Sequence, residues 1–480
     1  MEKLTVPHFF FFLLSMLTVA GFNHVFADRG VIGINYGRIA DNLPLPNNVV
    51  QLLKTQGLTR VKLYDTDATV LRALAGSDIS VTVALPNEQL AAAAASQSFT
   101  DAWVQSNISA YLPATQIKSI AVGNEVFADP NNTTQYLIQA MNNLYASLVK
   151  YNLSSSSNSN SSIKISSPIA LSSLQTSYPS SAGSFKTELI EPVIKPMLNF
   201  LRKTGSKLMV NAYPFFAYTA NSNDISLDYA LFKQNAGVVD SKSGLTYYSL
   251  FEAQLDAVHA AMSALQYNDV AIAVTETGWP SKGDENEIGA GAANAAAYNG
   301  NLVRRVLNGK GTPLRTETPL DVYLFALFNE NQKPGPTSER NYGLFYPNEE
   351  KVYDVPLTEK ALSAPVNGSK SQVNAPAPSG SSGSPSAAGQ TWCVANGNVE
   401  ERKLQEALDY ACGEGGADCH PIQMDATCFK PNTLEAHASY AFNSYYQMKK
   451  RAAGTCYFGG AAHVVTQTPR FGTCEYPTGY

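Results

Sequence analysis

Short apolar runs alternate with longer stretches of helical apolar spacing between Gly30 and Thr358. Eight of these runs have the length and the β-branched or aromatic content that are typical of buried strands. The candidate strands span residues 31–36, 60–64, 79–84, 117–123, 164–168, 208–213, 270–275 and 322–328. The candidate helices span residues 51–56, 91–111, 136–151, 192–204, 248–267 and 292–307. This alternation predicts an α/β fold, a (β/α)8 TIM barrel, with a doubly wound parallel sheet as the alternative.

Two glutamates occupy the strand ends at which such a barrel carries its chemistry. Glu125 follows the fourth candidate strand in Val-Gly-Asn-Glu, and Glu276 follows the seventh in Val-Thr-Glu-Thr-Gly-Trp-Pro. Hydrolysis of a glycosidic bond needs two carboxyl groups, because one protonates the leaving oxygen while the other attacks the anomeric carbon or activates water. A single glutamate after a strand is more often a solvated cap, but the pair favours a glycosidase.

Several neighbours of these glutamates are candidate sugar contacts. Asn124 is placed to donate a hydrogen bond to a sugar hydroxyl, and Trp279 either lies near the strand end or packs in the core. Four more aromatic residues end candidate strands, where some will line the cleft and others will be core. They are Tyr36, Tyr64, Tyr213 and Phe328, of which Tyr36 and Tyr213 are the favoured platforms for sugar rings.

The charge balance excludes some classes of partner. With 34 Lys and Arg against 39 Asp and Glu, and with no basic tract, the chain is mildly acidic. Nucleic acid is not an expected partner, because binding phosphates needs clustered cations. His259 is the only histidine between Gly30 and Thr358, which argues against a histidine-dependent triad or a histidine-rich metal site. We expect no metal and no organic cofactor.

The two ends of the chain indicate export. Residues 1–27 are predicted to be a signal peptide, since Lys3 precedes an apolar stretch over 9–20 that is too short for a membrane helix. The last residues carry no hydrophobic tail, so no membrane anchor is expected. We therefore predict a secreted protein of the extracellular space or cell wall, and a monomer. The candidate N-glycosylation sites are Asn107, Asn131, Asn132, Asn152, Asn160 and Asn367.

A change in composition predicts a second domain. Residues 364–390 are rich in Ser, Pro and Gly and read as a flexible linker between a barrel domain, 28–363, and a C-terminal domain, 391–480. The six cysteines all lie in the last domain, and their even number in an exported chain favours disulfides over a zinc site. They are Cys393, Cys412, Cys419, Cys428, Cys456 and Cys474. Their connectivity stays open, although a short Cys419–Cys428 link is one expectation.

Several motifs occur in the order of one enzyme family. They are Ile-Gly-Ile-Asn-Tyr-Gly at 32–37, Val-Lys-Leu-Tyr-Asp at 61–65, Ala-Val-Gly-Asn-Glu at 121–125, Asn-Ala-Tyr-Pro-Phe-Phe-Ala-Tyr at 211–218, Val-Thr-Glu-Thr-Gly-Trp-Pro-Ser at 274–281, Phe-Ala-Leu-Phe-Asn-Glu-Asn at 325–331 and Tyr-Gly-Leu-Phe-Tyr-Pro at 342–347. Through these motifs, most of residues 30–358 resembles the plant β-1,3-glucanases of glycoside hydrolase family 17.

The resemblance implies a retaining endohydrolase with Glu276 as nucleophile and Glu125 as general acid/base. It also implies a charged group beside the nucleophile, formed by Glu330, Lys333 and Glu339. The departures from the family pattern are Ala212 and Phe215, where Ile and Tyr are frequent, and Lys62, where Arg is common. We expect these three to alter subsite preference without touching the acids.

The C-terminal domain resembles the X8 module, carbohydrate-binding module family 43. The resemblance rests on Thr-Trp-Cys-Val-Ala at 391–395, Ala-Phe-Asn-Ser-Tyr-Tyr-Gln at 441–447 and Cys-Tyr-Phe-Gly-Gly-Ala-Ala at 456–462. It implies a small, disulfide-rich, mainly helical module that binds β-1,3-glucan. Tyr445 and Tyr446 would point ~100° apart on a helix, so at most one of them faces a ligand and the other is core.

Taken together, these features predict a secreted endo-β-1,3-glucanase that acts on callose or fungal-wall glucan. Two alternatives stay open. One is an enzyme that cuts mixed β-1,3;1,4-glucan and shares the same acids. The other is a wall-binding protein without hydrolytic activity, against which the presence of both glutamates argues.

Overall fold

The computed structural model describes residues 30–154, 162–363 and 391–478, the last range with gaps at 397–398, 400, 414, 425, 453–454, 466–468 and 470–473. The chain divides into two compact units, Met1–Gly368 and Ser369–Tyr480. The predicted signal peptide and linker lie outside the described residues. Among the helices that are described, none combines the length and the apolar character that crossing a membrane requires.

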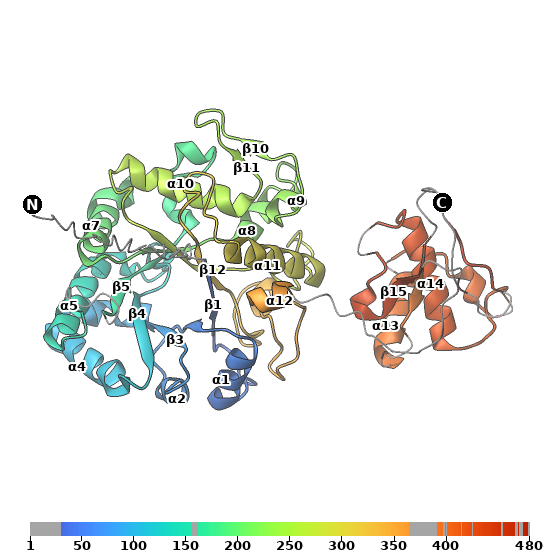
Figure 1. Cartoon of the computed structure of the whole chain (residues 1–480), viewed down its shortest axis with the longest axis horizontal. Coiled ribbons are helices and arrows are strands. Elements are labelled where there is room, and N and C mark those ends of the chain that lie inside the picture. The colour runs from blue at the N-terminus through green and yellow to red at the C-terminus, as the bar shows by residue number, and fades with distance from the viewer. Residues whose placement is uncertain are drawn as a thin grey trace, which may run out of the picture. The chain divides into compact units, whose positions relative to one another are not determined.

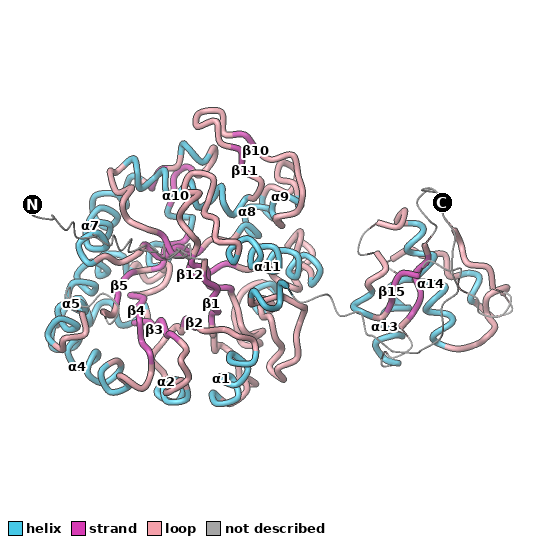
Figure 2. The backbone as a smooth tube through the Cα atoms, viewed as in Figure 1, coloured by secondary structure: helices cyan, strands magenta, loops and turns pink. Residues whose placement is uncertain are grey.

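In the first unit, a parallel sheet rolls into a barrel with helices around it (Figures 1 and 2). The strands follow one another in space as β5-β4-β3-β2-β1-β13-β12-β9-β6. Their bounds are β1 Val31–Asn35, β2 Arg60–Lys62, β3 Ser80–Leu85, β4 Gln116–Val122, β5 Lys164–Ser166, β6 Pro168–Ala170, β9 Leu208–Asn211, β12 Ile272–Thr277 and β13 Asp321–Leu324. β1 pairs with both β2 and β13, so the first and last strands of the barrel are neighbours. The predicted TIM barrel is confirmed.

The barrel closes through an interrupted strand. β5 pairs with β4 on one side, whereas β6 pairs with β9 on the other. Ser167 alone separates β5 from β6, so the two short strands occupy one strand position. The nine strands of the sheet therefore fill the eight positions that the apolar runs predict.

Five of the six predicted helix spans each overlap one α-helix of the structure, and the first unit adds five short α-helices for which no span was predicted. Those of the first unit are α1 Pro46–Thr55, α2 Ala68–Ala73, α3 Leu90–Ala95, α4 Gln97–Asn107, α5 Leu137–Lys150, α6 Thr187–Leu189, α7 Lys195–Thr204, α8 Pro214–Ala220, α9 Leu227–Ala230, α10 Leu250–Ala264, α11 Ala292–Leu307 and α12 Glu359–Ser363. The prediction of a single helix over 91–111 is wrong. Ser96 is extended and its hydroxyl accepts a hydrogen bond from the Phe99 N–H at 3.2 Å, so it ends α3 and caps α4.

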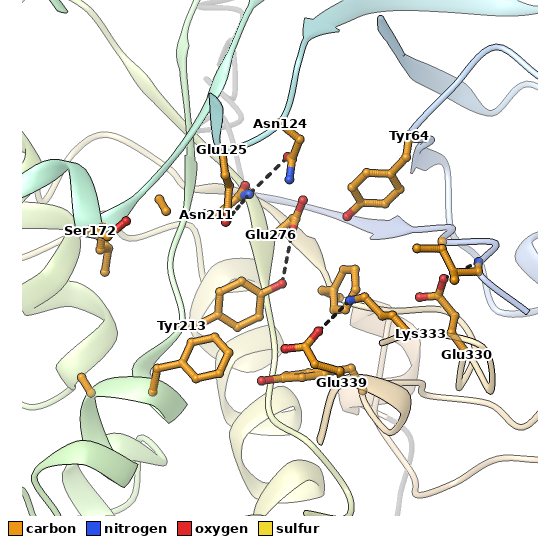
Figure 3. A pocket seen from close by; sticks show the side chains of 18 of the residues that line it. Tyr64, Asn124, Glu125, Ser172, Asn211, Tyr213, Glu276, Glu330, Lys333 and Glu339 are labelled. Carbon is orange, nitrogen blue, oxygen red and sulfur yellow. Dashed lines mark hydrogen bonds and ion pairs between the residues drawn. The ribbon is translucent and has the colours of Figure 1, made fainter. Parts of the chain in front are cut away.

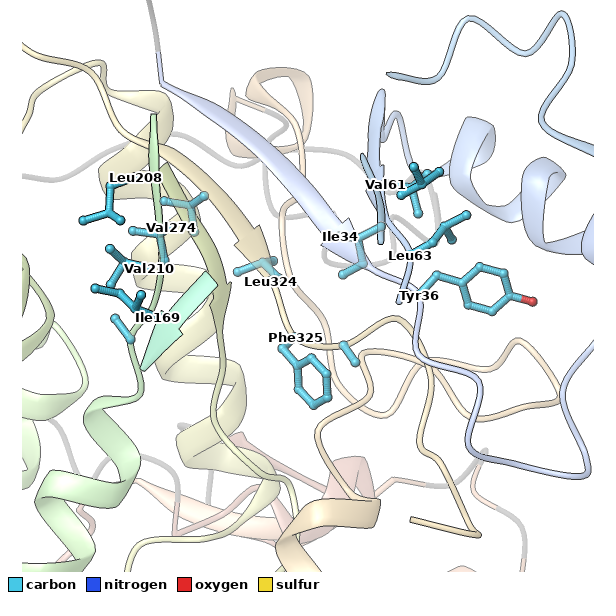
Figure 4. Packing of buried hydrophobic residues seen from close by; sticks show 14 of the residues in the cluster. Ile34, Tyr36, Val61, Leu63, Ile169, Leu208, Val210, Val274, Leu324 and Phe325 are labelled. Carbon is cyan, nitrogen blue, oxygen red and sulfur yellow. The ribbon is translucent and has the colours of Figure 1, made fainter. Parts of the chain in front are cut away.

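Apolar side chains fill the layer between the barrel strands and the helices around them. Ile34, Val61, Val210 and Leu324 are fully buried, and Figure 4 shows how residues of this cluster gather from different strands. Parallel strands are covered on both faces, which is why they read as continuous apolar runs. Two small antiparallel pairs lie outside the barrel sheet. They are β7 Leu174–Thr176 with β8 Ser184–Phe185, and β10 Val238–Val239 with β11 Thr246–Tyr247.

The second unit is a small helical module with three disulfides. Its elements are β14 Trp392–Ala395, α13 Glu401–Cys412, α14 Leu434–Met448 and β15 Ala462–Val465, and its disulfides are Cys393–Cys456, Cys412–Cys419 and Cys428–Cys474. The disulfide framework is as predicted, but the Cys419–Cys428 link is wrong. Cys412 ends α13, and the chain turns back at once to bring Cys419 to a Cα–Cα distance of 5.6 Å from it.

The three disulfides are expected to stabilise this unit unequally. Chain entropy predicts ~4 kcal/mol for links that close 63 and 46 residues, but ~2 kcal/mol for one that closes 7. Replacing Cys393 and Cys456 by Ser should therefore cost about twice the free energy of unfolding that the same change costs at Cys412 and Cys419. Hydrogen exchange resolved to residues 391–478 of the full chain measures both losses, and equal losses would contradict the prediction.

Candidate active site

Glu125 stands just after β4, in a turn that its neighbours hold. Gly123 and Glu125 are both left-handed, with φ of 66° and 49°. The Asn87 side chain accepts a hydrogen bond from the Asn124 N–H at 2.8 Å and donates one to the Asn124 carbonyl at 3.1 Å. The Glu125 N–H donates to the carbonyl of Pro168, at the start of β6, at 3.0 Å. A non-glycine residue held in this conformation is typical of functional sites, where the surrounding structure fixes it.

Glu276 lies in β12, and two side chains bind its carboxylate. The Lys62 ammonium, from β2, lies 2.7 Å from Oε1, and the Tyr213 hydroxyl donates to Oε2 at 3.0 Å. The pairing of β12 with β9 shifts register between Val274 and Glu276. Such irregularities re-aim side chains near active sites. Glu276 is thereby held at both oxygens.

Lys62 is an unusual lysine, because its side chain is 1% exposed. Besides Glu276, it contacts Asn124 Oδ1 at 3.5 Å and lies 4.2 Å from the centre of the Tyr64 ring. A buried ammonium needs a charged partner, and Glu276 supplies it. The expectation that Lys62 does not touch the acids is therefore wrong: β2 directs this side chain into the barrel, where it meets the carboxylate from β12.

Asn211, at the end of β9, holds the other glutamate. Its Nδ2 donates to Glu125 Oε1 at 2.9 Å, and its Oδ1 accepts from the Thr275 hydroxyl at 2.9 Å. The second bond fixes which end of the amide faces Glu125. Asn211 is not among the site residues predicted from the sequence. Its place at a strand end, next to the strand of Glu276, is the signal that would have indicated it.

The two carboxyl groups differ in their affinity for a proton. Burial and then the negative charge of Glu276 raise the pKa of Glu125, although the Asn211 hydrogen bond and two lysines oppose the rise. Burial alone would raise the pKa of Glu276 too, but the charge and hydrogen bond of Lys62 bring that pKa below its ordinary value. Neighbouring carboxyl groups whose pKa values are pushed apart can act as acid and as carboxylate in one reaction.

A cavity of about 670 Å³ lies over these groups (Figure 3). The three residues of the predicted charged group also line it: Glu330, Lys333 and Glu339. Lys333 forms an ion pair with Glu339 at 3.0 Å, and its ammonium lies 4.3 Å from the centre of the Phe325 ring. Glu330 accepts a hydrogen bond from the Ile39 N–H at 2.8 Å. Burial raises the pKa of Glu330, whereas the positive charge of Lys333 contributes to the low pKa of Glu276.

Some of the predicted aromatic platforms do not reach this cavity. Tyr64 and Tyr213 line it. Tyr36 and Phe328 are buried and pack edge to face with ring centres 6.1 Å apart, and Trp279 is buried with its N–H bonded to the Gly289 carbonyl at 2.8 Å. The prediction that these three contact sugar is therefore wrong. All three residues come after the ends of their strands, and the chain there turns these side chains into the core rather than toward the cavity.

The predicted glycosylation sites differ in their surroundings. Asn131, Asn132 and Asn152 are exposed. The side chain of Asn107 donates to the Trp103 carbonyl and accepts from the Thr66 hydroxyl, both at 3.0 Å. Asn160 and Asn367 lie outside the described residues.

In the second unit, the two adjacent tyrosines take different environments. Tyr446 is buried and its hydroxyl lies 2.9 Å from the Thr391 hydroxyl. Tyr445 is partly exposed and packs with Tyr410 and Phe458, with ring centres 6.1 and 5.3 Å away. Tyr445 is thus the one of the pair that remains available to a ligand.

A TIM barrel that presents two carboxyl groups to one cavity, one with a raised pKa and one with a lowered pKa, has the fold and site of a glycoside hydrolase. Comparison with known families agrees with this class. Residues 32–357 match the family described as Glycosyl hydrolases family 17, and residues 391–463 match the X8 domain. The chain belongs to glycosyl hydrolase family 17 and carries a C-terminal X8 domain.

Relatives resemble the chain over most of its length. Glucan endo-1,3-beta-glucosidase 13 of Arabidopsis thaliana is 41% identical over 451 residues, which cover 94% of this chain and 85% of the relative. Glucan endo-1,3-beta-glucosidase 12 of the same plant is 42% identical over 460 residues, covering 93% and 84%. The solved structure of CJP38, a beta-1,3-glucanase and allergen of Cryptomeria japonica pollen, matches with a TM-score of 0.65 and 41% identity, over 68% of this chain and 99% of that one.

Proposed function

We propose that the protein is a retaining endo-β-1,3-glucanase, with Glu276 as nucleophile and Glu125 as general acid/base. The observation that carries the proposal is the contact between Lys62 and Glu276, which keeps one carboxylate ionised beside a carboxyl group of raised pKa. The substrate, (1→3)-β-D-glucan, rests on the relatives named as glucan endo-1,3-beta-glucosidases, which match over 93–94% of this chain.

The reaction follows from these two roles. The Glu276 carboxylate attacks the anomeric carbon while Glu125 gives its proton to the leaving glycosidic oxygen, so that a covalent glycosyl ester forms and one glucan fragment departs. Glu125, now a carboxylate, takes a proton from water, and the resulting hydroxide attacks the anomeric carbon. The ester breaks and Glu276 returns to its carboxylate form. Two inversions leave the product with the β configuration of the substrate.

The second unit extends the proposal to insoluble substrates. We expect the X8 domain to bind β-1,3-glucan, with Tyr445 as a contact residue, and the linker to tether the barrel nearby. Tethering raises the effective concentration of the barrel at the polymer without changing its chemistry. We place the enzyme outside the cell, as a secreted monomer that acts on callose or on the glucan of fungal walls.

Glu125→Gln is expected to lower kcat on unactivated β-1,3-glucan by ~10²- to 10⁴-fold, because the amide cannot protonate the leaving oxygen. An aryl glucoside with a good leaving group needs no such proton, so its first step should be affected far less. Reducing-sugar release and a burst of aryl alcohol measure the two effects. Equal losses on both substrates would contradict the acid/base role.

The substrate and the stereochemistry are tested on the wild-type enzyme. A linear β-1,3-glucan should be cut internally and faster than a mixed β-1,3;1,4-glucan, and NMR should detect the β-anomer first. A preference for the mixed-linkage polymer would show that the proposed substrate is wrong. The α-anomer as first product would exclude Glu276 as nucleophile.

A further inference from the structure

Two loops at the carboxyl ends of the barrel strands are joined by hydrogen bonds. The first loop, residues 278–291, connects β12 to α11. The second, residues 325–341, follows β13 and contains the 3₁₀-helix Thr337–Arg340. Ser281 of the first loop donates to the carbonyl of Asn341 in the second, from its N–H at 2.8 Å and from its hydroxyl at 3.0 Å. The first loop therefore holds the end of the second.

Two carboxylates of the first loop bind the start of this 3₁₀-helix. Glu287 is only 9% exposed, and its Oε2 accepts hydrogen bonds from the N–H groups of Ser338 at 3.1 Å and Asp284 at 2.8 Å. The carboxylate of Asp284 accepts from the N–H of Thr337 at 3.0 Å and from its hydroxyl. The first N–H groups of a helix have no partner within it, and negative charge there is favourable. Asp284 and Glu287 together thus fix where the helix begins.

The same 3₁₀-helix holds Lys333 by both its side chain and its main chain. The Glu339 carboxylate forms an ion pair with the Lys333 ammonium at 3.0 Å (Figure 3). The Arg340 guanidinium donates to the main-chain carbonyl of Lys333 at 3.0 Å. Glu339 and Arg340 directly follow Ser338, the residue whose N–H Glu287 binds. A displacement of the start of the helix would therefore displace both contacts to Lys333.

The position of Lys333 affects the ionisation of both glutamates in the cavity. Burial, and for Glu125 also the charge of Glu276, acts to raise the pKa of each carboxyl group. The positive charge of Lys62 opposes the rise in both, and that of Lys333 adds to it. The charged and hydroxyl groups that face Glu276 are those of Lys62, Lys333, Glu125, Glu330, Tyr64 and Tyr213. Withdrawal of Lys333 would raise both pKa values, because a nearby positive charge favours the ionised form of a carboxyl group.

We propose that Asp284 and Glu287 are positioning residues for the hydrolysis, which hold Lys333 beside Glu276 by fixing the 3₁₀-helix between them. Neither carboxylate is among the described groups that line the cavity, so both act through other residues. The inference rests on the proposed function, because it assigns these residues a role in the same reaction. It makes the loop after β12 a determinant of the pH range in which the enzyme works.

The test measures kcat and KM on linear β-1,3-glucan across the pH range, with full-chain variants. Glu287→Ala should lower kcat at the wild-type optimum by about tenfold to a hundredfold, with a smaller change in KM, because a small displacement of a group at the site is costly. Both limbs of its pH–rate profile should move to higher pH. Glu287→Gln keeps an oxygen that can accept both hydrogen bonds, so it should recover most of kcat and the wild-type limbs. Glu285→Ala, an exposed position of the same loop, is the control and should match wild type.

Asp284→Ala keeps the inference testable if Glu287→Ala does not fold, because Asp284 is exposed and its loss leaves the buried carboxylate in place. It should move both limbs in the same direction, with a loss of kcat of about two- to tenfold. Thermal unfolding checks the fold of each variant. Folded variants with wild-type kcat, or with a lower kcat but unmoved limbs, would show that these carboxylates do not position Lys333. Wild-type enzyme that does not cleave β-1,3-glucan would refute the proposed function itself, whereas failure of this inference leaves wild-type hydrolysis intact.

Discussion

Glu276→Gln is expected to lower kcat on β-1,3-glucan by ~10⁴-fold or more, because an amide cannot form the covalent intermediate. The substitution is compatible with the hydrogen bonds that surround this side chain. The Gln carbonyl oxygen can still accept a hydrogen bond from Lys62, and the Tyr213 hydroxyl can accept one from the amide nitrogen. The fold should therefore persist, which thermal unfolding checks. If wild type and variant hydrolyse glucan equally, the protein is not a hydrolase that uses Glu276.

Azide distinguishes the two carboxyl groups. With an activated aryl glucoside, azide should enter from the face that a shortened Glu276→Gly side chain vacates and give an α-glucosyl azide. In Glu125→Ala the covalent intermediate still forms, and azide should attack its opposite face to give a β-glucosyl azide. Product configuration by NMR reads out both reactions. The reverse pattern would exchange the roles assigned to Glu125 and Glu276.

Lys62→Met is expected to lower kcat/KM at pH 5 by ~10²- to 10³-fold, because it leaves the Glu276 carboxylate buried without its cation. Lys62 is a positioning residue that acts through Glu276. Its charge lowers the pKa of Glu276, so without it the carboxylate gains a proton at a higher pH. The acidic limb of the pH–rate profile should therefore move to higher pH, and part of the activity should return as the pH rises.

Lys62→Arg is the matched control, because it keeps the positive charge and introduces Arg, the residue that is common at this position in the family. It should retain the acidic limb of the wild-type enzyme. Thermal unfolding separates loss of fold from loss of activity. A Lys62→Met enzyme that is folded, slow and unchanged in its pH profile would show that Lys62 does not set the ionisation of Glu276.

The barrel was largely predictable from the sequence. A parallel strand is buried on both faces, so each of the eight strand positions leaves an apolar run. Ser96 escaped detection because a run of alanines precedes it and apolar spacing does not record the extended backbone with which it caps the next helix. The interruption at Ser167 escaped for a similar reason, since the residues around it read as one short run.

The sequence was enough to predict which residues lie at strand ends, but not which side chains meet across the barrel. The position of Glu125 and Glu276 at strand ends was enough to predict them as a pair. The contact between Lys62 and Glu276 depends on which strands face each other and how far a long side chain reaches. Tyr36 and Phe328 follow the ends of their strands, and their burial depends on how the chain turns there, which the apolar runs do not record. The pairing of Cys419 with Cys412 depends on where α13 ends, which the spacing of cysteines leaves open.

The side-chain amide of Asn87 forms hydrogen bonds with both the N–H and the carbonyl of Asn124. Asn87 lies in the segment that follows β3, whereas Asn124 follows β4. Glu125, the proposed proton donor, is thus positioned by a segment more than thirty positions earlier in the chain. Laboratory recombination that exchanges this loop without its partner turn should give well-folded but poorly active chimeras. The two segments are expected to be inherited together, as one evolutionary module.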